Sequence, residues 1–148
     1  MRQVAFILLT LIICSCKQKQ ALFIEKIAAT TGINFTNQII ENDSLNFFSY
    51  QYIFNGAGVA VGDIDNDGWE DIFFVSNKQG GNKLYKNKGA FTFTDITNAA
   101  GVEGKSEWST GVTMVDINAD GWLDIYVSTV TIPRLLQSHN ELYINNRN

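Results

Sequence analysis

An internal repeat constrains the fold of this chain more than any other feature of its sequence. Residues 58–75, GVAVGDIDNDGWEDIFFV, return as residues 111–127, GVTMVDINADGWLDIYV. A second block, NKLYKN at residues 82–87, returns as NELYIN at residues 140–145. Segments that recur together at a period of about 50 residues indicate a repeat architecture, in which each copy forms one supersecondary unit.

The repeated segments have the character of strands, so the sequence predicts an all-β fold. Runs such as VAV, IFFV and FTFTDI are short, rich in β-branched and aromatic residues, and bounded by glycine or asparagine. A helical period is confined to residues 25–30, which predict one helical turn. Residues 93–102 also match residues 24–33, and we expect each to be a strand that ends in Gly-Val or Gly-Ile. Several strands per unit at this period are typical of a β-propeller blade.

Two repeats do not close a propeller, which needs roughly four to eight blades. We expect residues 22–57 to hold a partial blade strand and an insertion, residues 58–102 the first repeat, and residues 103–148 a second, truncated repeat. The first repeat continues into FTFTD, which has no counterpart in the second. This pattern favours the N-terminal fragment of a longer protein. The alternative is a short chain that pairs with other chains.

The N-terminus predicts export. Residues 4–13 are almost wholly apolar and follow Met1-Arg2. A positive start and a short apolar run are typical of a secretory signal, since the run is too short for a membrane span of ~20 residues. A buried N-terminal strand is the alternative.

The residues after this run resemble a bacterial lipobox, with Ser15 directly before the cysteine that is cleaved and lipidated. The resemblance implies a signal peptide over residues 1–15, lipidation of Cys16, and a tether over residues 16–21. Cys14 is a second, less favoured acceptor. Because both cysteines lie here, no disulfide is expected in the mature chain, and a metal is one other way to stabilise it.

The acidic residues are concentrated in two short loops. The net charge is −4, and seven of the fifteen acids are Asp63, Asp65, Asp67, Asp71, Asp116, Asp120 and Asp124. Outside these loops basic and acidic residues nearly balance, without the clustered Lys and Arg of a nucleic-acid surface. Such local acidity indicates bound cations, and we expect no nucleic-acid partner.

The spacing within the loops predicts calcium sites. The predicted ligands of the first loop are Asp63, Asp65, Asp67, the backbone carbonyl of Trp69, and Asp71, and those of the second are Asp116, Asn118, Asp120, the carbonyl of Trp122, and Asp124. Ca²⁺ takes six to eight oxygen ligands, whereas Mg²⁺ demands octahedral geometry and keeps its waters. An EF-hand loop has Glu at position 12, where these loops have Phe74 and Val127. Asx turns, in which aspartates only cap the backbone, are the alternative.

The loop pattern D-x-[DN]-x-D-G-x-x-D, with GV before it and DI-x-V after it, resembles the FG-GAP/VCBS repeat. Together with the NxLYxN and FxFxDITxxAGV blocks, it resembles the cartilage-acidic-protein (ASPIC/UnbV-type) branch, which includes bacterial lipoproteins. The resemblance implies about two blades of an integrin-type β-propeller, whose inter-strand loops bind about two calcium ions.

The sequence offers no catalytic constellation. His139 is the only histidine, so a zinc site with several histidine ligands does not assemble within this chain, and we expect His139 to be a loop residue. We expect a non-enzymatic module, anchored by lipid to the bacterial outer membrane on its periplasmic or surface face, that binds a protein or glycan. The alternatives are a non-catalytic part of a larger envelope hydrolase acting on polysaccharide, or a scaffold subunit of a surface complex.

Overall fold

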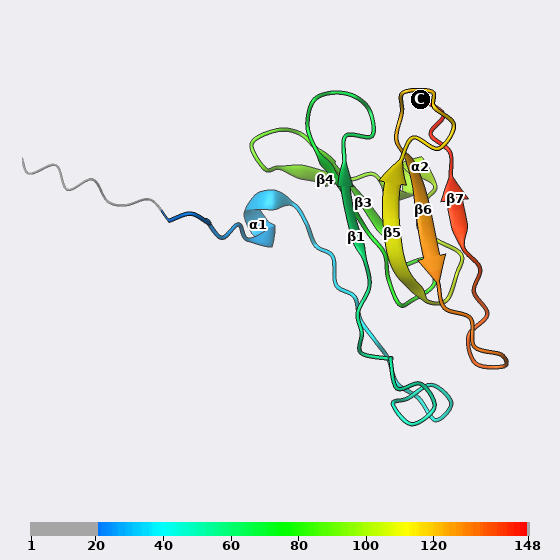
Figure 1. Ribbon diagram of the computed structural model, residues 1–148. Coiled ribbons are helices and arrows are strands. Elements are labelled where there is room, and N and C mark those ends of the chain that lie inside the picture. The colour runs from blue at the N-terminus through cyan, green and yellow to red at the C-terminus, as the bar shows by residue number, and fades with distance from the viewer. Residues whose placement is uncertain (1–20, 148) are drawn as a thin grey trace, which may run out of the picture.

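The computed structural model describes residues 21–147, and this part of the chain is built from short strands. The strands are β1 (Val59–Gly62), β2 (Asp71–Phe74), β3 (Lys83–Asn87), β4 (Phe93–Asp95), β5 (Ser109–Val115), β6 (Asp124–Thr129) and β7 (Glu141–Tyr143), and the helices are α1 (Ala28–Thr31) and α2 (Thr97–Ala100). One antiparallel sheet has the order β1-β2-β3-β4 and the other the order β5-β6-β7 (Figure 1). The predicted all-β fold with two blade-like sheets is confirmed.

The signal peptide, the lipidated Cys16 and its alternative Cys14 fall on residues 1–20, outside the described residues. Among residues 21–147 there is no helix with the length and apolar character needed to cross a membrane.

Each acidic loop connects the first two strands of its sheet. Loop 1 (residues 63–70) joins β1 to β2, where Gly62 pairs with Asp71, and loop 2 (residues 116–123) joins β5 to β6, where Val115 pairs with Asp124. Both loops lie at the same end of the two sheets (Figure 1). The repeat therefore places two similar loops beside each other. In each, the last aspartate of the motif, Asp71 or Asp124, is the first residue of the strand that follows the loop.

The two sheets pack through different faces. Phe73 and Leu84 of the first sheet, and Val75 directly after β2, form one buried cluster with Ile125 and Val127 of the second sheet. Gly62 permits this approach, because a Cβ at this position would lie 2.7 Å from the Leu123 Cδ1 atom. The interface thus joins the Phe73 side of one sheet to the Ile125 side of the other.

The face of the second sheet that corresponds, by repeat position, to the buried Phe73 face of the first sheet is exposed. Tyr126 occupies the repeat position of Phe73, and Leu142 that of Leu84. Phe73 and Leu84 are 0% and 2% exposed, whereas Tyr126 and Leu142 are 36% and 47% exposed. The same position therefore serves as core in one sheet and as surface in the other.

The prediction of a strand over residues 93–102 is wrong beyond Asp95, where β4 ends. The Asp95 Oδ1 atom accepts hydrogen bonds from the Thr97 N–H at 2.9 Å and the Thr97 hydroxyl at 2.5 Å. This local turn ends β4, and α2 follows, with Gly101 in the left-handed region at φ 68°. The matching segment forms α1 and ends at Gly32, with φ 80°. Residues 21–57 contain no strand.

The insertion over residues 34–57 is a packed excursion that builds a second, smaller core. Ile53, Trp108 and Leu136 are buried together, and the ring of Tyr50 meets the Trp108 ring edge-on with centroids 5.8 Å apart. Phe35 stacks on Phe74, with ring centroids 4.7 Å apart. Much of the insertion extends to the end of the sheets opposite the acidic loops (Figure 1).

Candidate metal centre

The last aspartate of each motif is buried and ties its loop to the sheet. Asp71 is 0% exposed, and its carboxylate accepts hydrogen bonds from the N–H groups of Ile64, at 3.0 Å, and Asn87, at 2.7 Å. Asp124 accepts the equivalent bonds from Ile117, at 3.1 Å, and Asn145, at 2.7 Å. Each of these carboxylates therefore joins the start of its loop to Asn87 at the end of β3 or to Asn145 just after β7.

The first aspartate of each loop shapes the turn. The two oxygens of Asp63 accept hydrogen bonds from the N–H groups of Asp67, at 3.1 Å, and Gly68, at 2.8 Å. Asp116 makes the same two bonds, to the N–H groups of Asp120 at 2.9 Å and Gly121 at 2.8 Å. Gly68 and Gly121 both have φ 87°, a left-handed conformation that favours glycine. The turn-capping alternative thus accounts for one role of these first aspartates.

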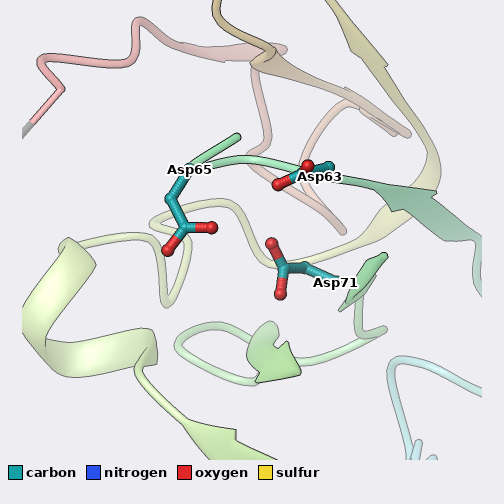
Figure 2. A group of neighbouring side chains, drawn as sticks. All are labelled: Asp63, Asp65 and Asp71. Carbon is teal, nitrogen blue, oxygen red and sulfur yellow. The ribbon is translucent and has the colours of Figure 1, made fainter. Parts of the chain in front are cut away.

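Three carboxylates of loop 1 converge on one point. Oxygen atoms of Asp63, Asp65 and Asp71 all lie within 4.8 Å of one another (Figure 2). Ligands on opposite sides of Ca²⁺ lie about 5 Å apart, because each Ca–O distance is about 2.3–2.6 Å. The spacing of the three carboxylates therefore suits a cation of this size.

Two features show that the carboxylates of this cluster are incompletely compensated by the surrounding side chains. Burial raises the pKa of Asp71 above its ordinary value, and the nearby charges of Asp67 and Asp63 add to the rise, against the opposing effect of its two backbone hydrogen bonds. The Asp65 Oδ1 atom is buried and accepts no hydrogen bond from the described residues. Capping explains neither feature, and a hard cation fits both.

Asp67, a predicted ligand, lies outside this three-carboxylate cluster. Its Oδ1 atom accepts the Trp69 N–H at 2.9 Å, and its Oδ2 atom lies 3.4 Å from the Lys86 Nζ atom. Lys86 also forms an ion pair with Asp65. Lysine thus supplies part of the positive charge that the loop attracts.

Loop 2 repeats the backbone geometry but has a smaller carboxylate set. Asn118 replaces the second aspartate, and its Nδ2 group donates to the Asp120 Oδ2 atom at 3.0 Å. The same oxygen lies 2.7 Å from the Arg147 guanidinium, whose hydrogen bond holds the pKa of Asp120 below its ordinary value. Asp120 Oδ1 accepts the Trp122 N–H at 3.0 Å. Each loop is therefore paired with one cationic side chain.

Asn87 and Asn145 are site residues that the sequence analysis left without a role. The Asn87 Nδ2 group donates to the Glu70 carbonyl at 2.9 Å. Asn145 makes the equivalent bond to the Leu123 carbonyl at 3.2 Å and a further bond to the Ile64 carbonyl of the other loop at 2.8 Å. Their position at the end of both NxLYxN blocks was the signal that could have revealed them.

Trp69 and Trp122 are themselves loop residues, and the ligand role of their carbonyls stays a prediction. Trp69 is 52% exposed and packs over Gly89, where a Cβ would lie 3.5 Å from the indole ring. A further bond, from Asn66 Nδ2 to the Gly121 carbonyl at 3.2 Å, joins the two loops directly. The loops thus form one continuous surface.

Comparisons with known proteins agree with this geometry. The family model of the FG-GAP-like repeat matches residues 63–127, which include both loops. The chain is 44% identical over 70 residues to cartilage acidic protein 1 of Xenopus tropicalis, and 41% identical over 70 residues to the human protein of this name. The match covers 47% of this chain, but only 11% and 10% of these relatives.

No solved structure matches the chain. The family model spans both acidic loops and β2, β3, β4 and β5, and it ends within β6, so the match runs from the first sheet into the second. Residues 63–127 therefore carry an FG-GAP-like repeat.

Proposed function

We propose that this chain is a calcium-binding, non-catalytic repeat module that binds a protein or glycan partner outside the cytoplasm. The observation that carries the proposal is the convergence of Asp63, Asp65 and Asp71, with the Asp65 Oδ1 atom buried and without a hydrogen-bond partner. The FG-GAP-like match across both loops supports the assignment.

The two loops would each hold one ion, through carboxylates that the fold already orients. In loop 1 these are Asp63, Asp65 and Asp71, and Asp67 would join them once its side chain leaves Lys86. In loop 2 the equivalents are Asp116, Asn118, Asp120 and Asp124, and in both loops the tryptophan carbonyl completes the predicted set. Bound calcium would supply the charge that lets these side chains lie close together, so its role is structural.

The partner would dock at the end of the sheets that carries the loops. Trp69 offers an aromatic surface there that is 52% exposed, next to carboxylates that the metal would fix in place. Aromatic side chains of this kind pack on sugar rings and on apolar protein side chains alike. The surface therefore fits both partner classes that we propose.

Lipid attachment at Cys16 is the second part of the proposal. It rests on the apolar run of residues 4–13 and on Ser15 before the cysteine. In a bacterial host fed a labelled fatty acid, we expect the chain to take up label and to fractionate with the outer membrane. Cys16→Ser should abolish labelling, while the control Cys14→Ser should retain it. The reverse pattern would move the acceptor to Cys14.

Calcium titration of the complete chain tests the central part of the proposal. We expect isothermal titration calorimetry to detect about two calcium ions per chain. A ligand at 100 times its Kd stabilises a fold by about 2.7 kcal/mol, which raises the Tm by roughly 10 °C for a domain of this size.

Asp65→Asn should weaken binding at loop 1, because it removes one of the converging carboxylates. Asp43→Asn is the matched control, since this exposed aspartate lies in the insertion. The proposal is wrong if the wild-type chain binds no calcium at millimolar concentration, or if the two variants bind alike.

A further inference from the structure

Each acidic loop contacts a cationic side chain from its own half of the chain. Lys86, on β3, pairs with Asp65 and Asp67, and Arg147, which follows β7, pairs with Asp120. The repeat does not explain this likeness, because the repeat position of Lys86 is occupied by Ile144 in the second half. The position of Arg147 corresponds to Gly89 in the first. The two cations thus reach equivalent aspartates from different places in the sequence.

The contacts place both charges on predicted metal ligands. Lys86 lies between Asp65 and Asp67, and its side chain is 23% exposed. Asp67, which it contacts at 3.4 Å, is the predicted ligand missing from the three-carboxylate cluster. In loop 2, Arg147 takes the Oδ2 atom of Asp120, the equivalent of Asp67. Each cation therefore engages a carboxylate that a bound metal would also use.

We propose that Lys86 and Arg147 are built-in counter-ions that compete with calcium for the loops, so that binding exchanges a tethered cation for the metal. The inference rests on the proposed function. Without metal, Lys86 reduces the net formal charge of the four ligand aspartates of loop 1 from −4 to −3, and Arg147 reduces that of the three ligand aspartates of loop 2 from −3 to −2. They reduce repulsion in the empty loops and weaken metal binding, since a calcium ion must displace them.

Removal of the lysine charge should change calcium affinity in the opposite direction to that expected if Lys86 had only a structural role. Lys86→Met keeps the apolar stem and should tighten calcium binding at loop 1 by about tenfold or more, because a unit charge a few ångströms away no longer opposes the ion. Without calcium the same variant should melt at a lower temperature than wild type. A lysine that only supports the fold would instead weaken binding when removed.

The amides of Gly68 and Gly121 distinguish the two loops. Each donates to the first aspartate of its own loop, so its NMR resonance reports calcium binding there. Lys86→Met should shift the Gly68 titration alone. Arg147→Gln should shift the Gly121 titration alone. Because the Arg147 side chain is 49% exposed, this substitution should leave the fold intact.

Two controls complete the experiment. Lys83→Met alters the same strand, but Lys83 pairs with Asp95 at 3.0 Å and not with a loop, so calcium affinity should stay unchanged. Lys86→Arg keeps the charge and should leave the affinity within about threefold of wild type. Failure of the wild-type chain to bind calcium would refute the proposed function. Wild-type binding with equal or weaker affinity in Lys86→Met and Arg147→Gln would refute the exchange alone.

Discussion

Asn145→Ala should destabilise the protein more than an ordinary surface substitution, because this side chain joins the two loops. Its Nδ2 group donates to the carbonyls of Ile64, at 2.8 Å, and Leu123, at 3.2 Å. A protein hydrogen bond contributes about 1 kcal/mol net, so the loss of these two part-buried bonds gives about 2 kcal/mol. The third bond of this side chain, from the Arg147 N–H to Oδ1 at 2.9 Å, is exposed and adds little. This corresponds to a decrease in Tm of roughly 8 °C and a decrease in the urea midpoint of about 1 M. Urea unfolding in the presence of a chelator measures the effect without any contribution from metal.

Two comparisons make this prediction specific. Asn146→Ala changes the exposed neighbour and should cost less than about 0.5 kcal/mol. Asn87→Ala removes bonds within one sheet only, so it should speed amide hydrogen exchange at Gly68 but not at Gly121. Asn145→Ala should speed exchange at both. If Asn145→Ala matches Asn146→Ala in stability, or opens only loop 2, the bond across the loops has no energetic role.

Three further predictions test the packing, the loop charges and the pH dependence. Gly62→Ala should destabilise the protein by about 1 kcal/mol, because its Cβ would lie 2.7 Å from the Leu123 Cδ1 atom. In a double-mutant cycle, Leu123→Ala in the same chain should relieve this clash, and simple additivity of the two effects would contradict the contact. At low ionic strength the Gly68 resonance should respond to less calcium than that of Gly121, because the predicted ligands of loop 1 include one more aspartate, and the reverse order would refute the charge argument. Burial opposes ionisation of Glu141, but hydrogen bonds from the Tyr143 hydroxyl and the N–H groups of Lys105 and Ser106 outweigh it and lower its pKa. A lowered pKa in the folded state stabilises the protein above the ordinary value of 4.5, and this stability is lost as the pH falls below that value. Glu141→Gln should flatten urea-measured stability over this acidic range, while the exposed control Glu103→Gln should not.

Much of the fold follows from the repeat. The two copies of GV-x-x-x-D predict a strand before each loop, and DI-x-V predicts the strand after it, as observed in β1, β2, β5 and β6. The alternation of apolar residues and the placement of glycine suffice to predict these strands, because β1 pairs with β2, and β5 with β6, through a short local loop. Asp95 shows where this reasoning ends: one Asx turn stops β4 after three residues, and the strand propensity of the following residues is overridden.

The site was predictable only in part, for a physical reason. The spacing of Asp63, Asp65 and Asp71 within one loop predicts their convergence, which the structure shows. Lys86 reaches its aspartates from β3, and Arg147 reaches Asp120 from the segment after β7, so no local spacing marks them. Asp67 illustrates the consequence, since it lies 3.4 Å from the Lys86 Nζ atom and outside the group that its spacing alone would assign.

The contact between the sheets has a direction. The Phe73 side of the first sheet meets the Ile125 side of the second, so the interface is heterologous, as in a head-to-tail assembly. A symmetric pairing would bury two equal faces and leave neither free. Here the counterpart of the buried face, marked by Tyr126 and Leu142, remains on the surface. Assembly by this operation is therefore self-perpetuating: each added sheet presents the surface that the next would cover, and only closure into a ring would bring it to an end.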